Sequence, residues 1–201
     1  MEQVILQHYQ GFTEVSMDSW QLQKRNVFLR GEINQQAANE LISQLIYLKE
    51  EDNDRDINLF IDSQGGGVKE GLSVIDAIKM SHLPVNIIVI GEAASMAAVI
   101  LACGEKGRRY IFPHSRVMIH EPLISGNMYK SASSLQDISK SLLKIKTMIN
   151  ELLASSTGKS LDEINEMVTE HDYWMDAQEA IEFGICDSIY QGFASGSTEM
   201  R

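Results

Sequence analysis

Three side chains distributed along the chain could together perform acyl-transfer chemistry. Ser95 follows an apolar run and stands among small residues, which allow a close approach of backbone. His120 ends another apolar run, and Asp172 precedes two aromatic residues. A serine nucleophile, a histidine base and an acid that orients the histidine form a complete catalytic set. Each residue alone has a simpler interpretation, as a helix cap, a structural histidine or a turn carboxylate, and their spacing does not show that they meet.

A run of three glycines, Gly65 to Gly67, closes one apolar strand and precedes a helix that begins at Val68. The unshielded N–H groups of such a run can hold an anion, although it could equally be only a tight turn between strand and helix. It is not a dinucleotide fingerprint, because Glu70 occupies the place of the third glycine, and no Gly-Lys-Ser/Thr of a Walker A loop follows it. No H-E-x-x-H or C-x-x-C motif occurs, so we expect no metal site.

The candidate catalytic residues stand at the ends of predicted strands. Short runs rich in β-branched or aromatic residues predict strands at 26–29, 57–61 and 85–90. Between them, apolar residues at helical spacing predict helices over 37–46 and 68–78. Strands joined through helices run parallel, and ligands bind at the carboxyl ends of the strands in open parallel sheets. We therefore predict an α/β fold.

The second half of the chain contains one long helix and several shorter elements. Helical spacing of apolar residues predicts the long helix over about 133–153. The spacing of Ser/Asp and Glu residues at 160–163 and 176–179 is that of capping boxes, which predict two further helices. Further strands are expected at 116–119 and 185–190.

No linker divides the 201 residues, which include only three prolines. We expect an N-terminal segment at 1–16, one domain at 17–191 and a flexible tail at 192–201. The net charge of −11 argues against nucleic acid or an anionic membrane as a partner. No apolar stretch approaches the ~18 residues of a transmembrane helix, and the two cysteines form no disulfide framework. We therefore expect a cytoplasmic protein with no membrane partner.

From about Ser16 to Tyr190 the sequence resembles the ClpP family, the proteolytic subunits of ATP-dependent Clp proteases. The nucleophile turn A-A-S-M-G of that family is similar to residues 93–97, and its S-P-G-G turn is similar to residues 63–66. Its K-G-K-R segment and the following P-N-S-R-V-M-I-H-Q-P are similar to residues 106–122. Its D-R-D segment, which contains the catalytic aspartate, is similar to the segment that starts at residue 170, with an aromatic residue one place farther along.

The resemblance implies a ClpP/crotonase-like α/β fold, a single-domain spiral of repeated β-β-α units with a long protruding handle helix. It implies that Ser95 is the nucleophile, His120 the general base and Asp172 the residue that orients the histidine. Gly66 and Met96 would donate backbone N–H groups to the oxyanion, which stabilises the charge that develops during acyl transfer.

The resemblance also implies an assembly. Members of the family form two stacked heptameric rings, to which a hexameric AAA+ Clp unfoldase delivers unfolded polypeptides. The segment 1–16 would lie in the axial region, and no cofactor is expected in the chain itself because the unfoldase uses the ATP. An aromatic residue is usual in the family where Asn58 stands. The implied contact residues are Asn58, Phe60 and Met80 for unfoldase docking, and Glu170 and His171 for the contact between rings.

We therefore expect a serine endopeptidase subunit that hydrolyses unfolded polypeptides to short peptides, with two alternatives. The first is a catalytically silent or accessory subunit of a mixed ring, against which intact Ser95, His120 and Asp172 argue. The second is a crotonase-type acyl-CoA enzyme, which predicts carboxylates rather than a serine and a histidine at the reacting centre. Gln64 and Ala97 stand where the family has proline and glycine, and neither substitution removes a catalytic atom.

Overall fold

A mostly parallel sheet forms the centre of the computed structural model, which describes residues 3–8, 11–52, 54–123, 131–169 and 171–192. Neighbouring strands in its main path run parallel. In spatial order they are β3 (Asn26–Ile33), β4 (Ile57–Gly66), β5 (Val85–Ala94), β6 (Arg109–Ile111) and β9 (Ser188–Ile189). The short strand β7 (Arg116–Ile119) continues beside β5 in parallel, and β8 (Tyr173–Met175) pairs with β7 in the antiparallel direction.

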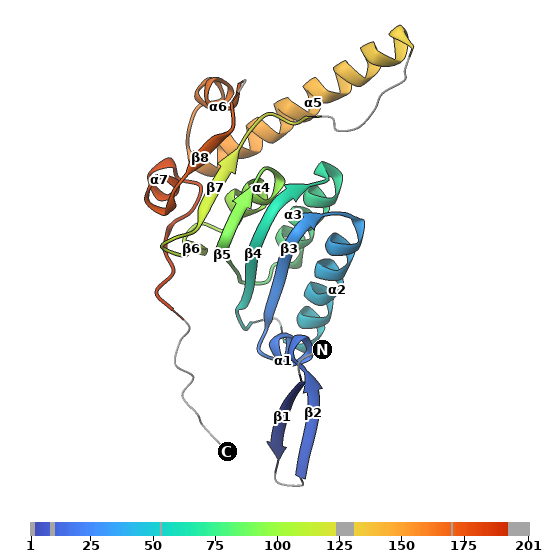
Figure 1. The fold of residues 1–201 in the computed structure, drawn as a ribbon, viewed down its shortest axis with the longest axis vertical. Helices are drawn as coiled ribbons and strands as arrows, with labels where there is room; N and C mark the ends of the chain where they lie inside the picture. The colour runs from blue at the N-terminus through green and yellow to red at the C-terminus, as the bar shows by residue number, and fades with distance from the viewer. Residues whose placement is uncertain (1–2, 9–10, 53, 124–130, 170, 193–201) are drawn as a thin grey trace.

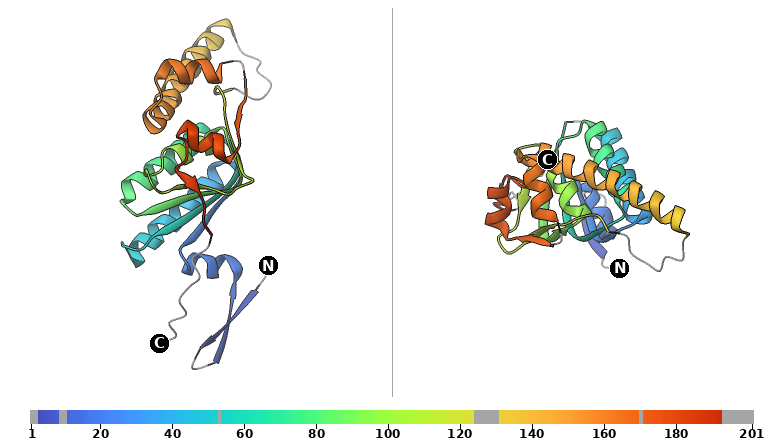
Figure 2. Two further views of the ribbon diagram at one scale, coloured as in Figure 1. Left: turned by 90° about the vertical axis from the view of Figure 1, so that its left-hand side faces the viewer. Right: turned by 90° about the horizontal axis from the view of Figure 1, so that it is seen from above.

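Three helices connect these strands and cover one face of the sheet (Figures 1 and 2). They are α2 (Gln35–Glu51), α3 (Val68–Ser81) and α4 (Met96–Ala102). Their apolar faces bury the side chains of the sheet that point toward them, and every residue of α4 is buried. The α/β fold predicted from the alternating periodicities is therefore confirmed.

The long helix α5 (Ala132–Thr157) projects from one end of the sheet, as Figures 1 and 2 show. It ends at Gly158, whose φ of 82° is the left-handed conformation that favours glycine at a helix end. The two predicted capping boxes are confirmed at Ser160 and Asp176, which begin α6 (Leu161–Val168) and α7 (Ala177–Phe183).

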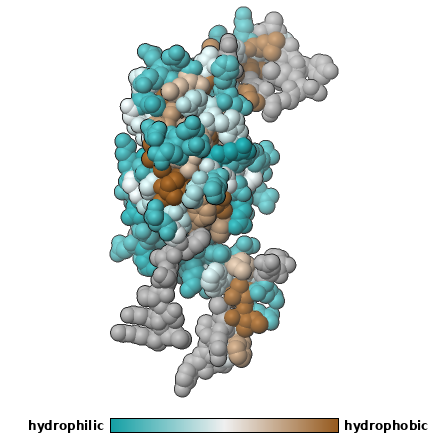
Figure 3. All heavy atoms as spheres, turned by 60° about the vertical axis from the view of Figure 1, so that its left-hand side comes forward, coloured by the Kyte–Doolittle hydropathy of each residue, from teal (hydrophilic) through white to brown (hydrophobic). Residues whose placement is uncertain are grey.

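The N-terminal segment has more structure than its weak periodicity indicates. β1 (Gln3–His8) and β2 (Gly11–Ser16) form an antiparallel hairpin at the opposite end of the molecule from α5, and α1 (Met17–Gln23) follows. On this hairpin Ile5 and Phe12 are 64% and 72% exposed, and Figure 3 shows hydrophobic residues on its surface.

The strand predicted at 185–190 is wrong in its length, because only Ser188–Ile189 pair with the sheet. Gly184 adopts the left-handed conformation at the end of α7. The N–H groups of Ile185 and Cys186 then donate to the carbonyl of Ala180, so these residues close the helix rather than extend a strand.

A buried ion pair joins the C-terminal strand to the rest of the molecule. Arg109 on β6 is only 3% exposed, and its Nε and Nη2 contact Asp187 at 3.0 and 2.5 Å. Its Nη1 donates to the carbonyls of Ala102 and Ser156, each at 3.2 Å. Burial alone would raise the pKa of Asp187, but the hydrogen bonds from Arg109 outweigh this effect and lower it. The pair therefore connects β6, the end of α4, the end of α5 and the residue before β9.

Candidate active site

Ser95 lies between β5 and α4 in an unusual backbone conformation. Its φ of 55° and ψ of −123° are outside the regions that residues with side chains ordinarily occupy. Its N–H donates to the carbonyl of Met118 on β7 at 2.8 Å, which helps to hold the turn. Such strained residues cost about 1–3 kcal/mol and are concentrated at functional sites.

His120 contacts Ser95 directly, although 25 positions separate them in the sequence. The distance from His120 Nε2 to Ser95 Oγ is 2.8 Å. The contact follows from strand pairing, because β7 lies beside β5 with Ala94 opposite Met118. Ser95 therefore follows the last paired residue of β5, and Ile119 and His120 follow the last paired residue of β7 beside it.

Asp172 lies near the other ring nitrogen of His120. The pairing of β7 with β8 places Ile119 opposite Tyr173, so the neighbouring residues His120 and Asp172 also face each other. The distance from His120 Nδ1 to Asp172 Oδ1 is 3.5 Å, which exceeds the ordinary length of a hydrogen bond. The histidine side chain is 17% exposed and the aspartate side chain 60% exposed. The structure thus brings the three residues together, with a close first contact and a looser second one.

The glycine run packs against the backbone around Ser95. A Cβ atom on Gly65 would lie 2.7 Å from Ser95 Cβ and 2.6 Å from the carbonyl of Ala94. A Cβ atom on Gly66 would lie 2.4 Å from the carbonyl of Ile33, so neither position accepts a side chain. The close approach of β4 to the serine turn therefore requires glycine at position 65, and its close approach to β3 requires glycine at position 66.

The two residues expected to donate N–H groups to the oxyanion, Gly66 and Met96, lie on segments that pack beside Ser95. Met96 is the first residue of α4, so its N–H has no carbonyl partner within the helix. Gly67 N–H donates to the carbonyl of Ile33 in β3 at 2.7 Å, and Gly66 lies opposite Ile33 in the pairing of β4 with β3.

Gln64 connects the same turn to β3. The Gln64 side-chain amide is assigned in the orientation that gives both its nitrogen and its oxygen a partner. In this orientation the nitrogen donates to the carbonyl of Gly31 and the oxygen accepts from the N–H of Glu32, each at 3.2 Å. The Gln64 side chain thus makes two hydrogen bonds to β3 at a position where the family that the sequence resembles has proline.

A cleft of about 540 Å³ opens beside Ser95 and His120 and extends along the glycine run to Leu123. A second, apolar hollow lies next to the serine on the side of α5. Sequence reasoning did not assign the residues of α5 that line it, because their helical spacing indicated only a packed face. The hollow is lined by Val68, Ser95, Met96, Val99, Ile119, His120, Pro122, Ile149 and Leu153.

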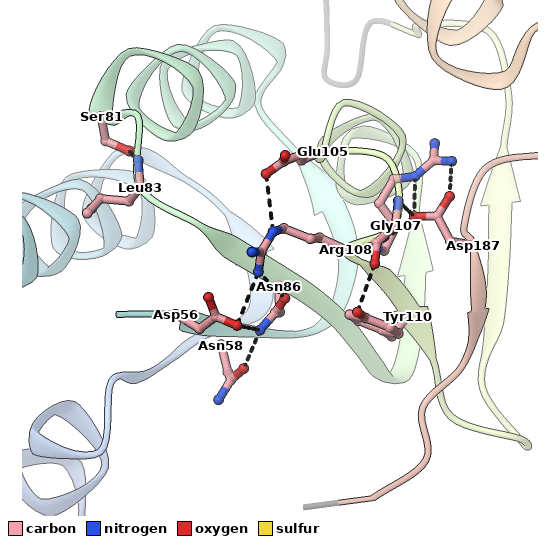
Figure 4. A network of polar contacts seen from close by, with 11 residues as sticks. Asp56, Asn58, Ser81, Leu83, Asn86, Glu105, Gly107, Arg108, Tyr110 and Asp187 are labelled. Atoms are coloured by element: carbon pink, nitrogen blue, oxygen red, sulfur yellow. Dashed lines mark hydrogen bonds and ion pairs between the residues drawn. The ribbon is translucent and has the colours of Figure 1, made fainter. Parts of the chain in front are cut away.

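Asn58 belongs to a row of amides that crosses three strands on the face of the sheet opposite α2 and α3. Its Nδ2 donates to Asn26 on β3 at 3.0 Å, and its Oδ1 accepts from Asn86 on β5 at 3.1 Å. Arg108 extends the row by donating to Asn86 at 2.9 Å, and it also contacts Asp56 at 3.1 Å (Figure 4). The Asn58 amide is therefore paired within the chain.

The other two predicted docking residues lie apart from each other. Phe60 shares the sheet face of Asn58, is buried and stacks on Phe28 with ring centroids 5.2 Å apart. Met80 is 74% exposed on α3, which covers the other face of the sheet. One chain alone therefore does not join all three residues in a single site.

The predicted ring-contact residues are only partly covered by the structure. His171 is exposed and immediately precedes Asp172, whereas Glu170 lies outside the described residues. On α5, Leu135, Leu143 and Met148 are large apolar side chains with exposures of 45%, 60% and 39%.

A model of the Clp protease family matches residues 11–192. The match includes the serine turn, the glycine run and the segments that contain His120 and Asp172. The chain therefore belongs to the Clp protease family. Membership supports a peptidase, and the family generally implies assembly into rings with Clp ATPases.

Within the part of the chain that the structure describes, no helix is long and apolar enough to cross a membrane. Over the same residues, no three His, Cys, Asp or Glu side chains are grouped so that they could hold a metal ion.

Proposed function

We propose that the chain is the proteolytic subunit of an ATP-dependent Clp protease and hydrolyses unfolded polypeptides as a serine endopeptidase. The observation that carries this proposal is the 2.8 Å contact between Ser95 Oγ and His120 Nε2, at a serine held in a strained turn. A structural serine needs neither the strained conformation nor a histidine within hydrogen-bond distance. The same contact favours an active subunit over a catalytically silent one.

In the proposed reaction, Ser95 Oγ attacks the carbonyl carbon of the scissile peptide bond while His120 Nε2 accepts the hydroxyl proton. The tetrahedral intermediate collapses when the histidine gives this proton to the leaving amine, and an acyl-enzyme remains. Water then attacks the ester with the histidine again as base, which releases the acid product and restores the serine. Asp172 orients the imidazole so that Nδ1 carries its proton and Nε2 is free to accept one.

The oxyanion of the tetrahedral intermediate would be held by the N–H groups of Gly66 and Met96. This assignment is supported by the position of Met96 at the start of α4 and by the close packing of the glycine run against the serine turn. Loss of one such donor typically costs about 3 kcal/mol of transition-state stabilisation. The cleft beside Ser95 and His120 would accept the substrate polypeptide.

We also propose the assembly implied by the family, two stacked heptameric rings that work with a hexameric AAA+ unfoldase. The exposed apolar side chains of α5 and of the β1–β2 hairpin support contacts at both ends of the subunit. The separation of Met80 from Asn58 and Phe60 supports a docking site formed between neighbouring subunits. Sedimentation velocity measures the mass of the assembly, and a fully active monomer would contradict this part of the proposal.

Labelling with a fluorophosphonate, followed by mass mapping of the modified residue, tests the catalytic proposal. We expect modification at Ser95, and we expect Ser95→Ala to abolish peptide hydrolysis with a loss on the order of 10⁶ in turnover. His120→Ala removes the base and is expected to be comparably inactive. His114→Ala is the matched control, because His114 is exposed at the start of the same segment. Hydrolysis that survives in Ser95→Ala would overturn the assignment.

A further inference from the structure

The residue that follows His120 forms an ion pair with the long helix α5. Glu121 accepts a hydrogen bond from Lys146 on α5, with 2.5 Å between Oε1 and Nζ. The bond from Lys146, together with a smaller contribution from the Thr169 hydroxyl, lowers the pKa of Glu121, although partial burial opposes this effect. Glu121 is therefore a carboxylate near neutral pH, and its ion pair joins the end of β7 to α5.

This ion pair is one residue along the chain from the looser of the two catalytic contacts. That contact joins His120 Nδ1 to the Asp172 carboxylate at 3.5 Å, and the aspartate side chain is largely exposed. Strand pairing between β7 and β8 ends at Ile119 and Tyr173, one residue short of both side chains. The position of His120 relative to Asp172 therefore depends on what holds the chain just beyond this last pair.

Glu121 is placed to meet this requirement. It is adjacent to His120 along the chain, and its side chain joins the end of β7 to Lys146 on α5. The two side chains of the ion pair are 36% and 26% exposed, and an ion pair with such exposure contributes little to overall stability. Because the ion pair contributes little to overall stability, we infer that its main effect is on the local geometry around Glu121.

We propose that Glu121, held by Lys146, is a positioning residue that fixes His120 against Ser95 and Asp172. The inference rests on the proposed serine-peptidase function. Glu121 does not touch the reacting atoms, and its effect passes through the backbone of His120. Loss of the pair should lower the rate of bond cleavage while short peptides still bind the cleft normally.

The test compares Glu121→Gln, Lys146→Met and the double variant in the full-length assembly. We expect kcat for a fluorogenic peptide to fall about 10- to 100-fold in each single variant, because small displacements of catalytic groups have effects of this size. KM should stay within about twofold, since only the chemical step is affected. The double variant should be no worse than either single one, because both substitutions break the same contact.

Two further variants separate positioning from a general loss of structure. Lys146→Arg keeps the cation and should retain most of the activity. Lys144 is an exposed lysine on the same helix, and it makes no ion pair with a described residue. Lys144→Met should therefore leave kcat unchanged. Sedimentation velocity on every variant checks that the assembly is intact.

The positioning role is overturned if Glu121→Gln and Lys146→Met keep wild-type kcat, if KM rises instead, or if the activity lost only follows loss of assembly. A wild-type protein that hydrolyses no peptide and is not labelled at Ser95 would instead contradict the proposed function. An active wild type with unaffected variants would reject the positioning role alone.

Discussion

Replacement of Asp172 by asparagine tests how strongly a loosely held acid supports the catalytic histidine. The carboxylate is 3.5 Å from His120 Nδ1. At this separation a unit charge pair is worth about 1 kcal/mol in bulk water and about 5 kcal/mol at an effective dielectric constant of 20. At about 1.36 kcal/mol per factor of ten, these limits correspond to losses of about 10-fold and about 3,000-fold in kcat.

Because Asp172 is largely exposed, we expect a loss in kcat near the lower end of the range from about 10-fold to about 3,000-fold. Because 60% of its side chain is exposed, water screens the charge that forms on the imidazole. We expect Asp172→Asn to lower kcat about 10- to 300-fold. The loss should be far smaller than that of Ser95→Ala, and also smaller than the roughly 10⁴-fold loss found where the acid is buried.

Steady-state hydrolysis of a fluorogenic peptide measures this loss, with Asp162→Asn as the matched control because Asp162 is an exposed acid on α6. A loss below about threefold would show that Asp172 does not orient His120. A loss of about 10⁴ or more would show that the working enzyme draws the carboxylate into a close, desolvated contact. Either result would refute the reasoning from the 3.5 Å distance and the exposure.

Three further substitutions have defined outcomes. Asp187→Asn leaves the buried Arg109 guanidinium without its carboxylate, so we expect a loss of about 3–5 kcal/mol in chemical denaturation, whereas Glu105→Gln at an exposed pair should have little effect. Folding lowers the pKa of Asp187 from its ordinary value of 3.8, so the carboxylate stabilises the fold above pH 3.8. This stabilisation is lost as the pH falls through the pKa of the folded protein, so the difference in unfolding free energy between wild type and Asp187→Asn should shrink in acid. Asn58→Tyr should tighten binding of a Clp unfoldase by about 1–3 kcal/mol in a titration, and unchanged affinity would reject this docking position. Gly65→Ala places a methyl group against the serine turn, so fluorophosphonate labelling should be lost while circular dichroism shows a folded protein.

The elements that could be predicted from the sequence are those whose signal is local. The β-branched run at 85–90 and the helical spacing after Val68 identify a strand and a helix without knowledge of their neighbours. The capping boxes at Ser160 and Asp176 identify helix starts because all of their hydrogen bonds join residues three apart or closer.

The elements that were not predicted depend on distant partners. β6 and β8 have three residues each, too few for any periodicity, and they are strands only because β5 and β7 lie beside them. The ion pair between Arg109 and Asp187 spans 78 positions, and each residue alone resembles an ordinary surface charge. The distance between His120 and Asp172 is set by the pairing of two such short strands, so no pattern in the sequence could give it.

The serine turn and the glycine run were two separate signals in the sequence, but in the structure they are two sides of one contact. The strained conformation of Ser95 brings its Cβ to a place where a side chain on Gly65 would collide with it. The next residue, Met96, packs its side chain on α3 where a Cβ atom on Gly71 would lie 2.2 Å from Met96 Cγ. Glycine is therefore needed at positions 65 and 71 because the serine turn packs against both. This packing, together with the hydrogen bond from Ser95 N–H to Met118, gives a physical reason why the strained conformation persists in the fold.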